Sequence, residues 1–264
     1  MTFNIGLVVN PLAGLGGSVA LKGSDNVAQE ALALGAVPKA NLRCIQALTE
    51  VAGLDVCVYA FAGDMGADCG LAAGIATEVI GQAKTQPSSA EDTMTAAQAL
   101  LKKGVDLLVF VGGDGTARDL LQAIGDQVPV VGIPAGVKIH SGVYGITPVA
   151  AGQVIAQLVK GELVSLRSQE VRDIDEEEFR AGRVKARYYG ELQVPESHQY
   201  MQATKDGAKE GSKELEALVL DTITAHVEEL MEPGVRYIMG SGSTVAAIMS
   251  YLDLENTLLG VDVI

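Results

Sequence analysis

Three glycines, a carboxylate and a hydroxyl stand together in the middle of the chain, in the run Gly112-Gly113-Asp114-Gly115-Thr116. Glycine has no Cβ, so the backbone can turn sharply here and its N–H groups can come close to an anion. The residues that follow have the pattern of a helix, whose first N–H groups and partial positive charge favour a phosphate group. The run therefore predicts a phosphate-binding turn.

Asp114 is the unexpected member of this turn, because a carboxylate repels phosphates unless a cation or a proton-transfer role compensates. We interpret it as a general base or as a partner of Mg²⁺. The alternative is a plain strand-to-helix turn in which Asp114 caps the helix and the glycines serve only the backbone. Arg118, in the same helix, is predicted either to contact phosphate or to pair with an exposed acid.

Strand and helix patterns alternate along the first part of the chain. Apolar runs that predict strands lie at 3–9, 55–61, 77–81, 105–111 and 128–133. Between them, helical patterns are predicted from Ser24 or Asp25 to Leu34, at 38–51, at about 114–124 and up to Lys103, the last of these opened by a capping box of Ser88 and Glu91. This alternation predicts an α/β fold with a doubly wound, mostly parallel sheet.

Several polar residues follow the predicted strands at their carboxyl ends, which open on one side of a parallel sheet. Asn10 and Gly14 follow the first strand and are predicted to lie beside the nucleotide, or to form a purely structural loop. Asp64 follows the second strand and either contacts a ribose or a metal-bound water, or caps the next helix. Lys138 follows the fifth strand and is predicted to meet a phosphate, with a solvated lysine as the alternative.

The pattern changes after a helix predicted at 147–160. Residues 163–174 and 183–194 alternate apolar and polar side chains, which is typical of antiparallel strands. A helix is predicted at 212–231, then a second glycine-and-hydroxyl turn before a helix at about 244–252, with the candidate phosphate-binding residues Gly240, Ser241, Gly242, Ser243 and Thr244. We expect an α/β nucleotide-binding domain at 1–150 and a β-rich second domain at 151–264.

The composition of the chain limits the classes of molecule that it is expected to bind. The formal net charge of −14 argues against binding to nucleic acid or to an anionic membrane, both of which reward a basic surface. Cys44, Cys57 and Cys69 are expected to be buried free thiols in a reducing compartment. No apolar stretch reaches membrane-spanning length, so we expect a cytoplasmic protein whose ligands are small-molecule nucleotides.

Three motifs carry a resemblance to a known family. The run 112–116 resembles the signature loop shared by ATP-NAD kinases and the diacylglycerol and sphingosine lipid kinases. Two further motifs resemble an early Asn-Pro-x-x-Gly turn and a late Gly-Ser-Thr-Ala turn of this superfamily: Asn10-Pro11 with Ala13 and Gly14, and Gly240 to Ala246. The glycine-rich start and the run Ser88 to Thr93 resemble the ATP-NAD kinase-like branch named for the acetoin-catabolism gene cluster.

The resemblance implies an ATP-dependent kinase that phosphorylates a ribose hydroxyl of NAD, with ATP and Mg²⁺ as cofactors. It implies that the glycines and Thr116 hold the donor phosphates, that Asp114 acts as the base or organises Mg²⁺, and that the turn at 240–244 holds the second nucleotide. It also implies an NAD kinase-like second domain, cut short after Ile264, and we expect a homo-oligomer.

One departure from the family leaves alternatives open. NAD kinases and lipid kinases carry an Asn-Glu pair after the central loop, and no Asn-Glu dipeptide occurs in this sequence. The alternatives are a kinase of the same fold that acts on another small molecule, and a non-catalytic nucleotide-binding regulator.

Overall fold

The computed structural model describes residues 2–15, 28–135, 139–163, 165–174, 186–197, 200–201, 227, 231–232, 234–257 and 260–264. The chain forms two compact units: one of residues 1–174 and 186–204, and one of residues 175–185 and 205–264. The boundary predicted at residue 150 falls inside the first unit. The predicted helix at 212–231 lies almost entirely outside the described residues.

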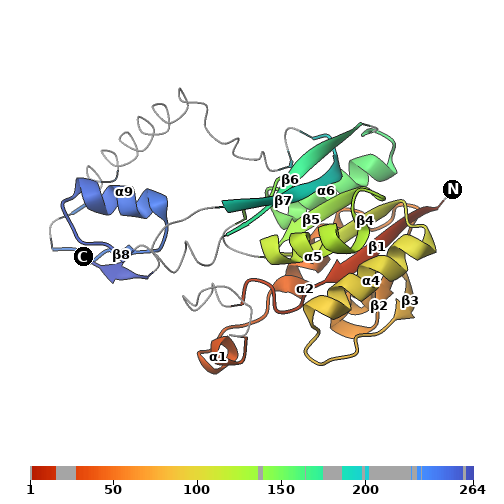
Figure 1. Cartoon of the computed structure of the whole chain (residues 1–264), viewed down its shortest axis with the longest axis horizontal. Coiled ribbons are helices and arrows are strands. Elements are labelled where there is room, and N and C mark those ends of the chain that lie inside the picture. The colour runs from red at the N-terminus through yellow and green to blue at the C-terminus, as the bar shows by residue number, and fades with distance from the viewer. Residues whose placement is uncertain are drawn as a thin grey trace. The chain divides into compact units, whose positions relative to one another are not determined.

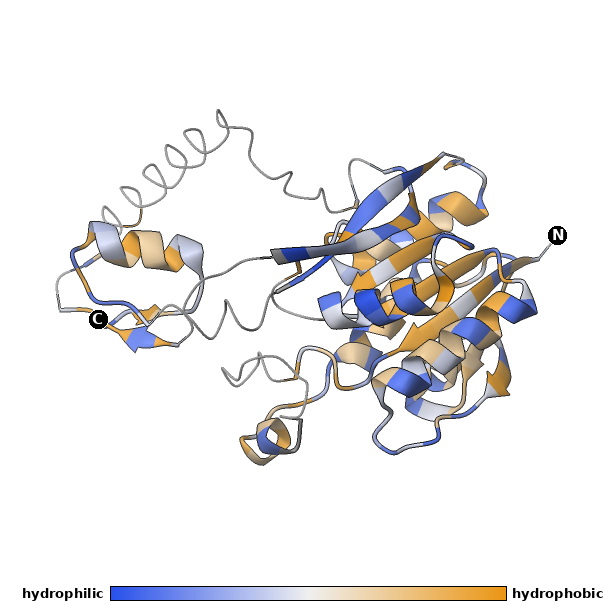
Figure 2. Ribbon diagram, viewed as in Figure 1, coloured by the Kyte–Doolittle hydropathy of each residue, from blue (hydrophilic) through white to orange (hydrophobic). Residues whose placement is uncertain are grey.

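The first unit is built on a parallel sheet of five strands in the order β3-β2-β1-β4-β5 (Figure 1). The strands are β1 (Phe3–Val9), β2 (Val56–Phe61), β3 (Ala76–Gly81), β4 (Leu107–Gly112) and β5 (Val130–Pro134). Every residue of β4 is buried, as the continuous apolar run predicted for a strand covered on both faces. Figure 2 shows these strands in hydrophobic colours within more polar helices.

Helices cover both faces of this sheet, which confirms the predicted α/β, doubly wound fold. They are α2 (Ala40–Thr49), α3 (Ala67–Ala72), α4 (Ala90–Lys103), α5 (Asp114–Ile124) and α6 (Pro148–Val159), with a short 3-10 helix η2 (Gly63–Met65). The short helix α1 (Ala28–Ala33) does not cover the sheet (Figure 1), and its Ala31 packs with Leu15 and Ala36 in a small separate cluster. Helix α4 packs against α5, and α2 packs against α3 and α6. The reversal of strand order after β3 accounts for these two groups, because right-handed crossovers in opposite directions place their helices on opposite faces.

An antiparallel hairpin of β6 (Leu166–Ile174) and β7 (Ala186–Pro195) completes the first unit, as the alternating patterns predicted. It packs on α5 and β5. The second unit contains β8 (Ile238–Met239), α9 (Ser243–Tyr251) and β9 (Asp262–Val263), with β8 and β9 antiparallel. No helix in the described ranges is long and apolar enough to cross a membrane.

The three cysteines are free thiols, as expected, but Cys57 is only half-buried. Cys44 of α2 and Cys69 of α3 are buried, and the interaction between the two thiols raises the pKa of Cys44 and lowers that of Cys69. Helices α2 and α3 each contribute one of these thiols, although strand β2 lies between the two helices in the sequence.

The capping box of α4 lies one residue later than predicted. Ser89 is the N-cap, and its hydroxyl accepts from the N–H of Asp92, whose carboxylate accepts in return from the Ser89 N–H. Asp92 also accepts from the Lys84 N–H and the Thr85 hydroxyl, whereas Glu91 is exposed. The prediction of Ser88 with Glu91 was wrong. The loop before α4 supplies two further donors, from Lys84 and Thr85, and Asp92 faces this loop whereas Glu91 does not.

We expect Asp92→Asn to lower the free energy of unfolding, because an amide group would face donors that now have a carboxylate acceptor. Leaving a buried donor unsatisfied costs about 1–3 kcal/mol. The bond from Thr85, with those from the backbone, holds the pKa of Asp92 well below its usual value. The difference in free energy of unfolding between wild type and Asp92→Asn should therefore be largest above pH ~4 and should decrease as the pH falls through the folded-state pKa of Asp92. Urea unfolding at several pH values measures this difference.

Candidate functional site

The two glycine-containing turns after β1 and β4 meet at the point where the strand order reverses. In an open parallel sheet, the loops on either side of this point leave a crevice at the carboxyl edge, where ligands bind. The Asn10 N–H donates to the Val111 carbonyl at 3.0 Å, and the Asn10 side-chain amide donates to the Thr116 hydroxyl at 3.1 Å. Asn10 thus fastens the first turn to the second, and its side-chain oxygen also accepts from the Leu12 N–H at 3.2 Å.

The glycines of the central turn serve different purposes. A Cβ on Gly112 would lie 2.4 Å from Thr116 side-chain atoms, so packing within the protein requires glycine there. A Cβ on Gly113 or Gly115 would meet no atom within 4 Å, and the φ of −118° at Gly113 is open to any residue. Nothing in the described protein requires glycine at these two positions, and both leave bare backbone beside open space.

Helix α5 begins at Asp114 with Gly113 as its N-cap, and no side chain caps it. The first N–H of the helical ladder is that of Ala117, which donates to the Gly113 carbonyl at 3.1 Å. The N–H groups before it lie at the positive end of the helix, an arrangement that favours an anion. The alternative that Asp114 caps its own helix is wrong, because its carboxylate is turned to another segment.

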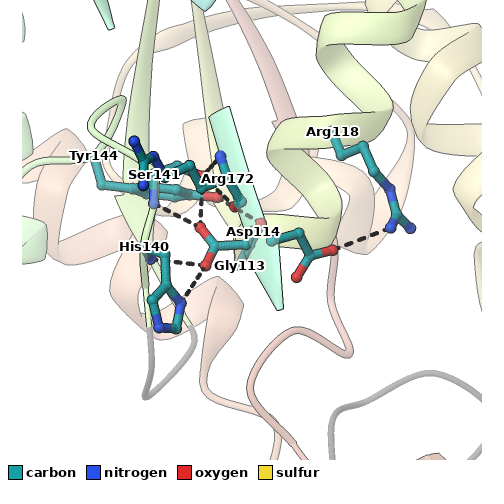
Figure 3. Close-up of polar contacts among 8 residues, drawn as sticks. Gly113, Asp114, Arg118, His140, Ser141, Tyr144 and Arg172 are labelled. Carbon is teal, nitrogen blue, oxygen red and sulfur yellow. Dashed lines mark hydrogen bonds and ion pairs between the residues drawn. The ribbon is translucent and has the colours of Figure 1, made fainter. Parts of the chain in front are cut away.

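That segment is the loop after β5, which surrounds the Asp114 carboxylate with donors (Figure 3). One oxygen accepts from the His140 N–H at 2.7 Å and lies 3.1 Å from His140 Nδ1. The other accepts from the Ser141 N–H at 3.1 Å and from its hydroxyl at 2.7 Å. Asp114 is 6% exposed, and these bonds hold its carboxylate in one orientation at the carboxyl edge of the sheet.

Ser141 and Tyr144 connect this carboxylate to the rest of the unit. The Ser141 hydroxyl accepts from the Arg172 N–H at 3.0 Å and also lies 2.8 Å from the Arg172 carbonyl, on β6. The Tyr144 hydroxyl donates to the Gly113 carbonyl at 2.6 Å, and its ring packs edge-on against Phe110. Complete burial, with the nearby charge of Asp114, raises the pKa of Tyr144 well above its usual value, so this donor stays protonated.

Direct coordination of Mg²⁺ by Asp114 does not fit this geometry. A carboxylate offers about four acceptor positions, and donors from His140 and Ser141 face both oxygens. Within the described residues, no group of three or more His, Cys, Asp or Glu side chains could hold a metal ion. Accepting a proton requires less of Asp114 than binding a metal ion does. It is enough that the hydroxyl of a bound acceptor replaces one of these hydrogen bonds at a carboxylate oxygen.

The other residues that the sequence predicted for the site do not all lie beside the central turn. Asp64 lies exposed in η2, where its backbone carbonyl accepts from Asn41, and no hydrogen bond of the described residues joins it to the central turn. Arg118 pairs with an acid, Asp173, at 3.1 Å, as in the second of its two predicted roles, but this acid is half-buried and not exposed. Lys138 lies outside the described residues. Gly14 lines a cavity beside the turn.

The later glycine-and-hydroxyl turn belongs to the second unit and opens a helix, as predicted. Gly242 is the N-cap of α9, with a φ of +135° that favours glycine, and no side chain caps the helix. A Cβ on Gly240 would meet nothing within 4 Å, and the side chains of Ser241, Ser243 and Thr244 are exposed. Its role in binding a second nucleotide stays a prediction.

Sequence reasoning missed the residues that hold Asp114. His140 and Ser141 were visible only as members of a loop at the carboxyl edge, where Lys138 attracted attention because of its charge. Tyr144 follows Val143 and looks like an ordinary core residue, while Arg172 contributes only backbone groups. The order of the strands, which brings the β4 and β5 loops together, is the signal that would have found them.

Comparison with known proteins gives one family match. The model of the ATP-NAD kinase N-terminal domain matches residues 5–163, which include nearly all of the parallel sheet, the central turn and the loop at 139–144. A search of curated protein sequences finds no match to this chain.

Two solved structures from Bacillus anthracis str. Sterne are similar over part of the chain. One is a diacylglycerol kinase, with 16% identity and a TM-score of 0.29 over 66% of this chain and 43% of that one. The other is a putative diacylglycerol kinase, with 15% identity and a TM-score of 0.30 over 66% of this chain and 46% of that one. The chain thus covers less than half of each of these structures, and likeness at this level carries no information on function.

Proposed function

Because the chain belongs to the ATP-NAD kinase family, we propose that it is an ATP-dependent kinase that phosphorylates a ribose hydroxyl of NAD to give NADP. The donor phosphates lie on the bare backbone of Gly113 and Gly115 and on the first N–H groups of α5. Phosphoryl transfer needs positioning and charge stabilisation more than covalent chemistry, and a helix N-terminus beside a crevice supplies both.

The observation that carries the proposal is the placement of Asp114. Its carboxylate is buried, turned away from the backbone N–H groups of its own helix, and oriented by His140 and Ser141 at the carboxyl edge of the sheet. In the proposed reaction it accepts the proton of the acceptor hydroxyl as that oxygen attacks the γ-phosphorus of ATP. The bond from this phosphorus to the β,γ-bridging oxygen breaks, and ADP leaves with its electron pair. A positioned base of this kind contributes about 10²–10⁴-fold to a rate.

Ser141 is suited to support Asp114 in both protonation states. Its single hydroxyl proton can point to the Asp114 carboxylate or to the Arg172 carbonyl, which lie at 2.7 and 2.8 Å. While Asp114 is ionised, the hydroxyl donates to it, because hydrogen bonds to a charged group are the stronger ones. Once Asp114 holds the proton, the hydroxyl can donate to Arg172 and accept from Asp114.

We expect Ser141→Ala to lower kcat by on the order of 10-fold with little change in the KM for ATP, because the hydroxyl acts on the base and not on the donor. Steady-state kinetics with varied ATP measure both constants. A selective rise in KM for ATP with unchanged kcat would contradict this role of Ser141.

A kinase with another small-molecule acceptor is the second candidate, and the absence of an Asn-Glu dipeptide favours it. The test is incubation of the chain with ATP, Mg²⁺ and NAD, with NADP measured through an NADP-specific dehydrogenase. Formation of NADP supports the first candidate. No NADP, in protein that nucleotide still stabilises against thermal unfolding, would overturn the NAD assignment and leave another acceptor or a non-catalytic role.

A further inference from the structure

A cavity of ≈ 280 Å³ opens at the carboxyl edge of the sheet, between the turn after β1, the start of α2 and the end of β5. Its lining is apolar or backbone apart from two cationic side chains: Ala13, Gly14, Leu15, Val37, Lys39, Arg43 and Ala135. Ligand pockets measure about 300–1,000 Å³. A cavity of this size therefore suits one part of a nucleotide.

The two cations are placed where they repel each other. Lys39 is the N-cap of α2, and its carbonyl accepts from the Arg43 N–H at 3.0 Å, so the side chains are one helical turn apart on the same face. Like charges at this spacing are unfavourable, and so are cations at the positive end of a helix. The first turn of α2 holds no acidic residue, and the ion pairs of the described residues include neither Lys39 nor Arg43.

This concentration of positive charge is unexpected in a chain of net charge −14. An anion bound between the two side chains would remove their repulsion and complement the helix terminus at the same time. Local conflicts of this kind in a folded chain are typical of functional positions.

The cavity adjoins the central turn. The Arg43 guanidinium donates to the Pro134 carbonyl at 3.3 Å, which holds it at the end of β5. The next residue, Ala135, lines the cavity and donates its N–H to the Gly112 carbonyl at 2.9 Å. A ligand lying on the backbone of residues 112–116 can therefore extend into the cavity.

We propose that Lys39 and Arg43 form an anion subsite in this cavity, which binds a phosphate group of the nucleotide held by the central turn. The subsite deepens the proposed function and rests on it. Its chemistry is that of a phosphate anion, which can come from the polyphosphate of the donor or from the pyrophosphate of a dinucleotide acceptor.

The test compares the double variant Lys39→Gln/Arg43→Gln with a matched control, Lys102→Gln/Lys160→Gln, which removes the same charge from exposed positions of the first unit. Isothermal titration calorimetry with inorganic tripolyphosphate and with NAD, at low and high salt, measures binding. The subsite variant should lose on the order of 10- to 100-fold in affinity for at least one probe, with a smaller salt dependence, while the control stays like wild type. Loss for tripolyphosphate assigns the subsite to the donor, and loss for NAD assigns it to the acceptor.

Thermal unfolding in anion-free buffer separates binding from folding. Removal of two repelling charges offsets the loss of the Arg43 bond to the Pro134 carbonyl, so the melting temperature of the subsite variant should stay near that of wild type. The stabilisation by tripolyphosphate should be abolished. The proposal is overturned if the variant binds both probes like the control, or if wild type binds neither probe.

The two proposals fail separately. Binding of tripolyphosphate through Lys39 and Arg43 without any formation of NADP would leave the subsite standing and overturn NAD as the acceptor. Formation of NADP with wild-type KM values for both substrates in the subsite variant would leave the activity standing and overturn the subsite.

Discussion

Asp114→Asn is expected to lower kcat by about 10²–10⁴-fold, the usual contribution of a positioned general base. Asparagine has nearly the same shape, but its side chain cannot take a proton from the acceptor hydroxyl at neutral pH. Nucleotide binding should persist, because the bare backbone of Gly113 and Gly115 and the start of α5 are unchanged. The coupled assay for NADP gives kcat, and calorimetric titration with ATP gives the affinity.

The variant also disturbs the fold, so it needs a structural control. The amide group would face a donor of His140 or of Ser141, and an unsatisfied buried donor costs about 1–3 kcal/mol. Asp92→Asn is matched, because Asp92 is also a buried carboxylate that accepts from backbone N–H groups and hydroxyls, 2% exposed against 6% for Asp114. Asp92→Asn should lose stability with kcat per folded molecule unchanged. Equal turnover in the two variants would contradict a role for Asp114 as the base.

The sequence alone was sufficient for the parts of the fold that local patterns determine. The apolar runs at 3–9 and 105–111 predicted the strands β1 (Phe3–Val9) and β4 (Leu107–Gly112), because burial on both faces of a parallel sheet leaves few polar positions. The same reasoning placed the two turns at one edge of the sheet, where the bond between Asn10 and Thr116 now joins them.

Contacts between distant segments were beyond this reasoning. Sequence patterns could not choose between the roles of Asp114, since its partners, His140 and Ser141, come from a loop two elements later. The ion pair of Arg118 depends on where the hairpin packs on α5, and the sequence predicted the hairpin without its docking position. These features depend on the order of strands and on loop packing, and neither leaves a periodic trace in the chain.

The glycines of the central turn allow binding to be separated from folding. Gly112→Ala should destabilise the protein by about 1–3 kcal/mol, the usual cost of overpacking, because the new Cβ would lie 2.4 Å from Thr116. Gly115→Ala should leave the free energy of unfolding unchanged, or raise it by up to about 1 kcal/mol, because alanine is the better helix residue and its Cβ meets nothing within 4 Å.

The same Gly115→Ala change should weaken binding of ATP roughly 10- to 100-fold, the effect of losing one hydrogen bond to a charged group. Its methyl group would occupy the space that a phosphate needs to reach the first N–H groups of α5. Thermal unfolding and calorimetric titration of the two variants measure stability and affinity side by side. Wild-type affinity in Gly115→Ala would mean that the open space beside the turn holds no phosphate, and the glycine there would then have no explanation in either folding or binding.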